Sequence, residues 1–299
     1  MKTLVVLLGP TAVGKTELSL SLAVMLGSPI INCDSRQLFA GLHIGTATPT
    51  PEQMQRVKHY FVGTLPLDAY YSAAQYETDV LKLTEELFKT HDTLLLTGGS
   101  MMYIDAVCKG IDDIPTVSED VRNAIKKRLA EEGLEALVDE LQRVDPEYYA
   151  IVDKKNTRRV VHALEIYHMS GQTYTSFRTK SQRPRPFRII KIGLNRPREE
   201  LFPRINARVD QMMAEGLMDE VRTFLPYREC NALNTVGYKE LLNVIDGEWE
   251  QQMAVERIKK NTRVYAKKQL TWFQRDEDIK WFHPDDRDKI EEYIKQTLS

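Results

Sequence analysis

An eight-residue pattern near the N-terminus constrains this chain more than any other feature of its sequence. The pattern is Gly-x-x-x-x-Gly-Lys-Thr, and its residues are Gly9, Pro10, Thr11, Ala12, Val13, Gly14, Lys15 and Thr16. It stands between an apolar run at residues 3–8 and helical periodicity at 15–26, the setting in which such a loop binds phosphate through backbone N–H groups. Lys15 supplies a positive charge, and the Thr16 hydroxyl supplies a ligand for Mg²⁺. The sequence therefore predicts a strand, a phosphate-binding loop and a helix.

Four apolar runs have the character of buried parallel strands, because their apolar residues do not alternate with polar ones. They lie at residues 3–8, 29–33, 93–97 and 189–194. Helical periodicity fills residues 15–26 and 73–89, and it returns after the last strand at 198–215, 218–225, 238–245 and 250–273. Strands that alternate with helices are typical of a doubly wound sheet. The predicted fold is therefore α/β, with a parallel sheet like that of the P-loop NTPases.

The third and fourth strands are separated by far more chain than one crossover helix needs. Residues 111–188 show helical periodicity and no convincing strand. Two residues have the character of helix starts. Ser118 is followed by acidic residues, and Asp145 is followed by a proline. We therefore predict a helical insert at 111–188, and a catalytic core formed by residues 1–110 and 189–299.

Composition favours a soluble protein in a reducing compartment. Of the 299 residues, 42% are hydrophobic and 28% are charged, and no apolar run approaches the length of a membrane span. The three cysteines, Cys33, Cys108 and Cys230, are too widely spaced for a disulfide framework or a zinc site. We expect a cytoplasmic protein with no membrane partner. Its formal net charge of −2 requires that any polyanion be held by local basic patches.

A second candidate site follows the strand at 29–33. Asp34 comes directly after this run and is followed by Ser35, Arg36 and Gln37. It therefore lies at the carboxyl edge of the sheet, where α/β proteins bind their ligands. Its carboxylate can be a Mg²⁺ ligand, a general base or a cap for the next helix.

The strand at 93–97 lacks the aspartate that usually holds Mg²⁺ in nucleoside triphosphatases. It ends instead in Gly98-Gly99-Ser100. Two glycines after a strand let backbone or ligand approach closely, although an ordinary turn has the same composition and is the simpler interpretation. The loop at 9–16 therefore indicates phosphate without indicating ATP.

Two groups of basic residues come late in the chain. The first group, which no acidic residue interrupts, is Arg178, Lys180, Arg183, Arg185, Arg188 and Lys191. The second lies on the helix predicted at 250–273 and comprises Arg257, Lys259, Lys260, Arg263, Lys267 and Lys268. A solvated helix face has the same composition. Two such groups in a slightly acidic chain nevertheless favour a polyanion partner.

Longer matches point to one family. They include the loop at 9–16, Asp34-Ser35-Arg36-Gln37, Gly45-Thr46-Ala47-Thr48-Pro49, Gly98-Gly99-Ser100, Arg158-Arg159, Arg208-Val209, Gly237-Tyr238-Lys239-Glu240, and a run at 262–272 that ends in Thr271-Trp272. The chain resembles the bacterial tRNA dimethylallyltransferases over nearly its whole length. Ser100 stands where that family usually has threonine, and His162 stands where it usually has arginine.

The resemblance implies transfer of a dimethylallyl group from dimethylallyl diphosphate to N6 of adenosine 37 of tRNA, beside the anticodon, with release of diphosphate. Lys15, Thr16, Mg²⁺ and Arg208 are implied to stabilise the leaving diphosphate. Asp34 is implied to accept the N6 proton as a general base. The implied tRNA contacts are Asp34, Ser35, Arg36, Gln37, Ser100, Arg122, Arg158, Arg159 and His162. We expect a monomer that grips the anticodon stem-loop with its insert and basic groups.

Two other functions share parts of this pattern. An ATP-dependent kinase of a nucleotide or small metabolite has the same loop and the same α/β core. An adenylate-binding module without catalysis has the loop alone. The missing strand aspartate and the late basic groups favour the tRNA prenyltransferase over both.

Overall fold

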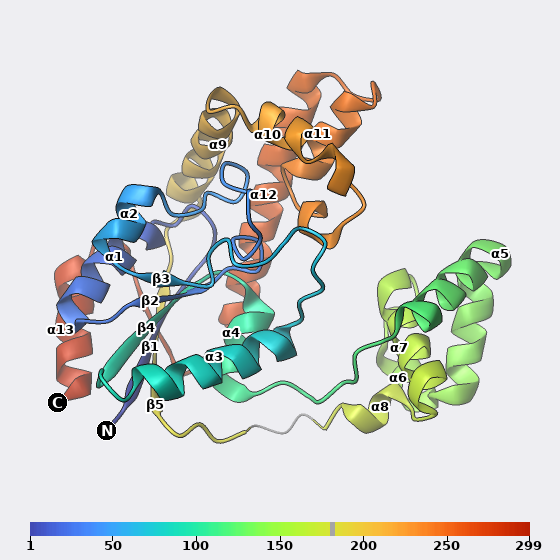
Figure 1. Cartoon of the computed structure of the whole chain (residues 1–299), viewed down its shortest axis with the longest axis horizontal. Helices are drawn as coiled ribbons and strands as arrows, with labels where there is room; N and C mark the ends of the chain where they lie inside the picture. The colour runs from blue at the N-terminus through green and yellow to red at the C-terminus, as the bar shows by residue number, and fades with distance from the viewer. Residues whose placement is uncertain (180–182) are drawn as a thin grey trace. The chain divides into compact units, whose positions relative to one another are not determined.

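The computed structural model describes residues 1–179 and 183–299, which form two compact units. The core unit comprises Met1–Lys109 and Pro184–Ser299, and the insert unit comprises Gly110–Arg183. Figure 1 shows the elements of each unit along the chain. Lys180, which the sequence placed in a basic group, lies outside the described residues.

The centre of the core unit is a parallel sheet, as the sequence predicted. In the described residues its strands are β1 (Thr3–Leu8), β2 (Ile30–Cys33), β3 (His59–Tyr60), β4 (Thr93–Gly98), β5 (Arg188–Leu194) and β6 (Ile279–Phe282). They are ordered β3-β2-β4-β1-β5-β6, and every neighbouring pair is parallel. The four predicted strands are confirmed. The sequence missed β3 and β6, which are short edge strands without a continuous buried run.

Helices cover both faces of the sheet, which explains why its central strands are apolar on both sides. α3 (Ala73–Leu87) and α4 (Met101–Lys109) pack on one face. α1 (Lys15–Leu26) and α13 (Arg287–Leu298) pack on the other (Figure 1). Successive residues of β1 face these two cores in alternation. This buried framework fixes the carboxyl edge of the sheet, where both candidate sites lie.

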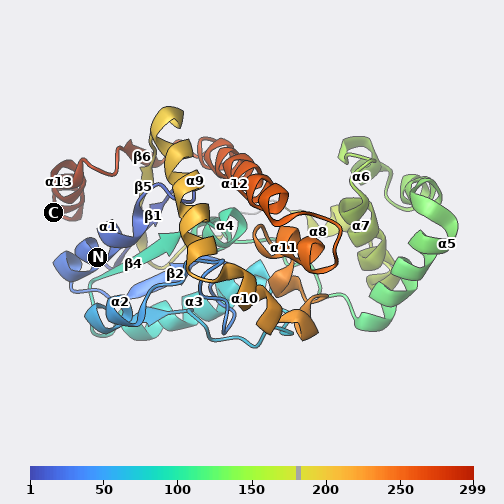
Figure 2. The ribbon, with the colours of Figure 1, turned by 90° about the horizontal axis from the view of Figure 1, so that it is seen from above.

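Further helices of the core unit contribute to a third apolar cluster. They are α9 (Arg198–Ala214), α10 (Leu217–Thr223), α11 (Tyr238–Ile245) and α12 (Gln251–Phe273), which follow β5. α2 (Pro51–Arg56), which precedes β3, has no buried residue. α12 packs against α9 and α11, as Figure 2 also shows. Phe39 and Leu42, from the segment after β2, join the apolar core of this cluster. No helix in the described residues is both long and apolar enough to cross a bilayer.

The insert unit has a hydrophobic core of its own. Its helices are α5 (Glu119–Val144), α6 (Pro146–Ile151), α7 (Thr157–Ser170) and α8 (Tyr174–Phe177). Leu141 of α5 and Leu164 of α7 are fully buried in this core. The buried Asp145 begins α6, because its carboxylate accepts a hydrogen bond from the backbone N–H of Tyr148 at 3.0 Å. Residues 110–179, which include all of these helices, contain no strand.

The insert unit ends at Arg183, earlier than the predicted residue 188, because Arg185 belongs to the core unit. The Arg185 side chain is 6% exposed, and its Nη2 atom lies 2.6 Å from Oε1 of Glu77. Lys191 is likewise buried, with its Nζ atom 2.8 Å from Oδ2 of Asp276. Both residues were grouped with surface cations by sequence. Their buried ion pairs stabilise the core unit and withdraw them from any polyanion.

Candidate active site

The phosphate loop joins β1 to α1 at the carboxyl edge of the sheet. Gly9 has a φ of 153°, and a Cβ atom there would lie 2.7 Å from the carbonyl oxygen of Leu194, so no larger residue fits. Gly14 precedes α1 with a φ of 116°. The N–H groups in the first turn of α1 have no acceptor within the helix and carry the positive end of its dipole. The loop therefore offers several backbone donors to an anion.

Lys15 begins α1, and its ammonium group folds back over the loop. The Nζ atom donates to the carbonyl oxygens of Gly9 at 2.9 Å and Pro10 at 2.7 Å. Burial lowers the pKa of Lys15 to about 7, while the Asp34 carboxylate raises this pKa and Arg208 lowers it. Burial also lowers the pKa of Arg208, which Asp34 raises. Lys15, Asp34 and Arg208 are therefore close enough to act on one another electrostatically.

Asp34 directly follows β2, and its carboxylate caps the turn that comes next. Oδ1 accepts hydrogen bonds from the backbone N–H groups of Arg36 at 2.9 Å and Gln37 at 3.4 Å. A cap was one of the three roles that the sequence allowed for Asp34, and the carboxylate caps a turn here instead of a helix. Oδ2 has no hydrogen-bond partner among the described residues. One carboxylate oxygen is thus fixed by the turn, and the other can accept a proton.

Ser100 connects the end of β4 to the segment after β2. Its hydroxyl accepts a hydrogen bond from the N–H of Ser35 at 2.8 Å and donates to Oγ of Ser35 at 3.1 Å. A Cβ atom on Gly99 would lie 2.5 Å from Nε2 of Gln269, so the glycine pair permits a close approach and is not an ordinary turn. These contacts orient Ser35. A direct contact of Ser100 with tRNA stays a prediction.

Gln269 on α12 joins the phosphate loop to the turn after β4, and the sequence did not identify it as a site residue. This side chain is 2% exposed. Its Oε1 atom accepts a hydrogen bond from the N–H of Thr11 at 2.9 Å, and its Nε2 atom donates to the carbonyl oxygen of Gly99 at 2.8 Å. The N–H of Thr11 is therefore engaged within the protein. The only signal for Gln269 was the family match at 262–272.

Glu220 of α10 holds the segment that follows the second candidate site. Its carboxylate accepts hydrogen bonds from the backbone N–H groups of His43 at 2.9 Å, Ile44 at 2.8 Å and Gly45 at 2.9 Å. It also accepts a hydrogen bond from the hydroxyl of Tyr238 at 2.6 Å. Four donors on one carboxylate satisfy its hydrogen-bonding capacity. α10 and α11 thereby fix the conformation of this segment.

Arg36 and Gln37, which were predicted to contact tRNA, also make contacts within the core unit. Nη1 of Arg36 donates to the carbonyl oxygen of Asn231 at 2.5 Å. Nε2 of Gln37 donates to the carbonyl oxygens of Thr46 and Ala47, at 3.0 Å each. The amide donors of Gln37 are therefore used by the protein, and its Oε1 atom is the one it can offer to a base edge. The tRNA contacts of Arg36 and Gln37 stay predictions.

Thr16 is the residue predicted to hold Mg²⁺, and its side chain is exposed in the first turn of α1. In the described parts of the chain, no group of three or more His, Cys, Asp or Glu side chains can hold a metal ion. Mg²⁺ often binds one or two protein oxygens together with substrate phosphates and water. A hydroxyl beside a phosphate loop therefore fits Mg²⁺ that binds with a diphosphate, and not a metal centre made by protein alone.

The predicted tRNA contacts of the insert unit lie on α5 and α7. Arg158 and Arg159 are exposed in the first turn of α7, and neither forms an ion pair with a described residue. Nδ1 of His162 lies 3.4 Å from Oε2 of Glu165. Arg122 lies on α5. Arg158 and Arg159 are therefore surface charges rather than a brace within the insert.

Comparison with known proteins identifies the family. A sequence model of the family described as IPP transferase matches residues 37–276. The tRNA dimethylallyltransferase 1 of Bacteroides thetaiotaomicron is 61% identical over 99% of this chain and 96% of its own length. The tRNA dimethylallyltransferase 1 of Phocaeicola vulgatus is 62% identical over 98% of this chain and 97% of its own length.

A solved structure agrees with these sequence matches. The full-length tRNA isopentenylpyrophosphate transferase from Bacillus halodurans superposes with a TM-score of 0.73 at 33% identity, covering 100% of this chain and 97% of that one. The resemblance and the α/β fold predicted from the sequence are both confirmed. The chain belongs to the tRNA dimethylallyltransferase family, which is also described as the IPP transferase family.

Proposed function

We propose that this chain transfers a dimethylallyl group from dimethylallyl diphosphate to N6 of adenosine 37 in the anticodon stem-loop of tRNA, leaving i6A and free diphosphate. One observation carries the proposal. This chain belongs to the family, and its phosphate-binding loop carries Lys15 close enough to Asp34 and Arg208 for their charges to shift the pKa of Lys15. A site for a diphosphate and an adjacent proton acceptor are the two groups that this transfer requires.

The first requirement is to stabilise the diphosphate as it leaves. The bond between the allylic carbon and its oxygen breaks, and the electron pair stays on the diphosphate oxygen. The N–H groups of α1, the Lys15 ammonium and the Arg208 guanidinium would meet that growing negative charge. Donors fixed in advance lower the barrier because they need not reorganise during the reaction. Partial burial of Lys15 and Arg208 strengthens their attraction to an anion, because water screens such charges less than exposed ones.

The second requirement is to remove a proton from N6. The lone pair of this amine is delocalised into the adenine ring, so N6 is a weak nucleophile. Oδ2 of Asp34 would accept the proton as the new C–N bond forms, while Oδ1 keeps its hydrogen bonds to Arg36 and Gln37. The target base must leave the stack of the anticodon loop to reach this site.

Mg²⁺ is part of the proposal. The Thr16 hydroxyl would hold the ion together with diphosphate oxygens and water. When bound, the ion neutralises charge on the diphosphate. Lys15 and Arg208 would share that neutralisation from the protein side.

A transfer assay without ATP tests the proposed function. The purified chain is incubated with unmodified tRNA, Mg²⁺ and dimethylallyl diphosphate labelled in the prenyl group. The label is expected in tRNA, and mass spectrometry of the digested nucleosides should show one dimethylallyl group on adenosine. A tRNA with guanosine at position 37 is expected to stay unlabelled. A product that forms only with ATP, beside unlabelled tRNA, would favour a kinase and contradict the proposal.

The proposed substrate also suggests where the protein works. We place it in the cytoplasm, with the tRNA pool, as a monomer. Cys33 and Cys108 are buried free thiols, which suits a reducing compartment. Cell fractionation tests the location, and light scattering of the purified chain tests the oligomeric state.

The insert unit is proposed to bind tRNA phosphates through Arg158 and Arg159. The double variant Arg158→Ala with Arg159→Ala is expected to weaken tRNA binding. The slope of the logarithm of tRNA affinity against the logarithm of salt concentration should become less steep by roughly 0.7–0.9 for each lost phosphate contact. Donor affinity is expected to be unchanged, because the donor site lies in the core unit. Lys89→Ala removes an exposed charge from the core unit and is the matched control. An unchanged salt slope with a lower melting temperature would show that the arginines stabilise the insert instead.

Lys15 is expected to take up a proton when the donor binds above neutral pH. Its pKa is about 7, so the ammonium is mostly deprotonated at pH 8. A bound diphosphate stabilises the charged form and raises this pKa, so binding at pH 8 takes up a proton, and donor affinity falls as pH rises above 7. Calorimetry in buffers with different ionisation enthalpies measures the uptake, and Lys15→Met should abolish it. Binding heats that do not depend on the buffer would contradict this expectation.

A further inference from the structure

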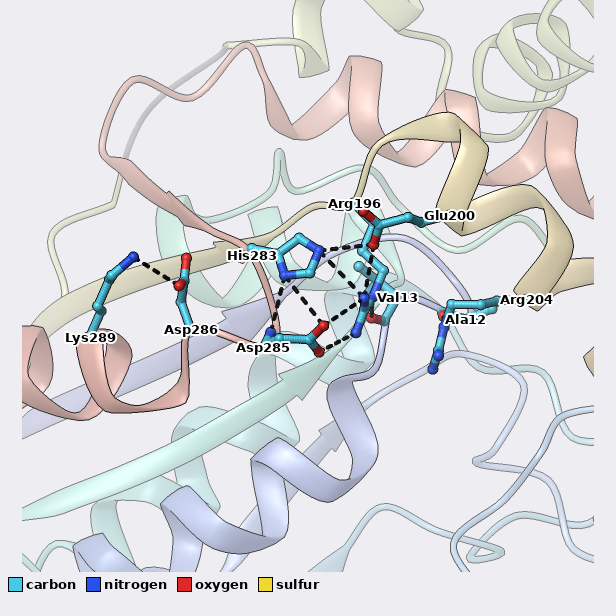
Figure 3. Close-up of polar contacts among 9 residues, drawn as sticks. All are labelled: Ala12, Val13, Arg196, Glu200, Arg204, His283, Asp285, Asp286 and Lys289. Carbon is cyan, nitrogen blue, oxygen red and sulfur yellow. Dashed lines mark hydrogen bonds and ion pairs between the residues drawn. The ribbon is translucent and has the colours of Figure 1, made fainter.

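Two arginines that follow β5 contact the backbone of the phosphate loop (Figure 3). Nε of Arg196 donates to the carbonyl oxygen of Val13 at 3.0 Å, and Nε of Arg204 donates to that of Ala12 at 3.1 Å. The Arg196 side chain is 9% exposed, whereas Arg204 is exposed. Neighbouring residues therefore hold the Arg196 side chain in place, whereas the exposed Arg204 side chain is less constrained.

Carboxylates from two separate segments hold the Arg196 guanidinium. Nη1 donates to Glu200 at 3.1 Å and to Oδ2 of Asp285 at 3.1 Å, and Nη2 donates to Oδ1 of Asp285 at 2.5 Å. His283 joins the two acids, because its Nε2 atom lies 3.0 Å from Glu200 and its Nδ1 atom accepts from the N–H of Asp285 at 3.3 Å. A bidentate pair of this kind fixes the plane of the guanidinium. The segment after β6 is thus connected to the phosphate loop through Arg196 (Figure 3).

The same segment also borders the loop directly. A Cβ atom placed on Gly14 would lie 3.6 Å from Cβ of Pro284 and 3.9 Å from Nη2 of Arg196. The peptide unit between Val13 and Gly14 is therefore held by a hydrogen bond on its carbonyl and enclosed by neighbouring side chains. Both constraints limit its rotation.

The orientation of this peptide unit decides where one donor of the loop points. In a trans peptide, the C=O and N–H groups point in opposite directions. The carbonyl of Val13 points to Arg196, so the N–H of Gly14, which belongs to the same peptide, points away from Arg196. A cation on the carbonyl also polarises the peptide and makes its N–H a stronger donor. Arg196 thereby sets the direction and the strength of one backbone donor.

We propose that Arg196 is a positioning residue that prepares the N–H of Gly14 to bind the diphosphate of the donor. Arg196 acts through the peptide between Val13 and Gly14 and does not itself touch the diphosphate. The side chains of Glu200 and Asp285 hold it in place for this task. The identity of the donor rests on the proposed function, whereas the effect on the loop rests on these contacts alone.

Diphosphate binding to two variants tests the proposal. Calorimetry measures the affinities of the wild type, Arg196→Met and Arg196→Lys for dimethylallyl diphosphate and, separately, for inorganic diphosphate. Arg196→Met is expected to lose about 10- to 100-fold in both, the scale of a charge-assisted hydrogen bond. Arg196→Lys keeps a charge beside Val13 and should lie between Arg196→Met and the wild type. Affinity for tRNA should be unchanged in both variants.

The matched control is Arg287→Met, which removes an exposed arginine whose Nε atom lies 2.8 Å from Glu291 on α13. It should change neither affinity. Diphosphate affinities within twofold of wild type in both Arg196 variants would overturn the proposal. Equal losses for diphosphate and tRNA, without rescue by lysine, would also overturn it, because a residue that only stabilises the fold predicts that result.

A second variant covers the case in which Arg196→Met does not fold. Asp285→Asn weakens the ion pair with the Arg196 guanidinium, and the hydrogen bond from Arg196 to Val13 can still form. A smaller loss of diphosphate affinity than in Arg196→Met is therefore expected. No loss would overturn the proposal. Failure of the proposed function is distinguishable from these outcomes. A wild type that binds inorganic diphosphate but not dimethylallyl diphosphate would contradict the proposed donor, and the inorganic ligand would still decide the role of Arg196.

Discussion

Replacing Asp34 with asparagine is expected to lower kcat by at least about 100-fold, the usual scale of general-base catalysis. Asparagine keeps the size of the side chain and an acceptor oxygen, so the hydrogen bonds to the N–H groups of Arg36 and Gln37 can persist. The variant also lowers the pKa of Lys15 further, because the Asp34 carboxylate raises it in the wild type. Single-turnover transfer with saturating donor at pH 6, where Lys15 is more fully protonated, isolates the chemical step.

Donor binding separates a general base from a metal ligand. A base predicts that the affinity for dimethylallyl diphosphate at pH 6 changes little in Asp34→Asn. A donor affinity that collapses and then returns with added Mg²⁺ would make Asp34 chiefly a metal ligand. Asp246→Asn is the matched control, because it makes the same chemical change in an ion pair with Arg228 and should leave kcat unchanged.

Replacing Lys15 with alanine is expected to lower kcat/KM for the donor by about 100- to 1,000-fold, the scale for removing one preorganised donor from an anion site. The ammonium of the partly buried Lys15 lies against the carbonyl oxygens of Gly9 and Pro10, where water screens its charge less than at the surface. Steady-state kinetics with varied donor measure the loss, and tRNA affinity should stay near that of the wild type. Lys289→Ala, which removes an exposed partner of Asp286, is the control. A near-wild-type kcat/KM would rule out donor binding at this loop.

Local patterns explain which parts of the fold were predictable. β1, the phosphate loop and α1 are contiguous, so the apolar run, the glycines and the helical period can be recognised from neighbouring residues. Asp34 was predictable for the same reason, because it directly follows a recognisable strand. β3 and β6 were missed because no continuous apolar run marks them. They are strands because they pair with β2 and β5, which the local sequence does not encode.

The contacts that shape the candidate site come from distant parts of the chain. Gln269 reaches Thr11 across 258 positions, and Arg196 reaches Val13 across 183. Arg185 was grouped with surface cations because its neighbours in sequence are basic, although it is paired with a glutamate 108 positions away. A charged or amide side chain gives no sign of its partner until the chain folds. The groups proposed to perform the chemistry were therefore recognisable in the sequence, whereas the groups that contact and position them were not.

Glu220 has a consequence for how the core unit treats anions. Three successive N–H groups, those of His43, Ile44 and Gly45, converge on its carboxylate much as the N–H groups of a phosphate loop converge on phosphate. The Glu220 carboxylate is part of the chain, so its effective concentration at these N–H groups is higher than that of free phosphate in solution. One backbone anion site is thus permanently occupied by the protein itself. The loop at the end of β1 is the one that we propose for the diphosphate of the donor, which is exchanged at every turnover.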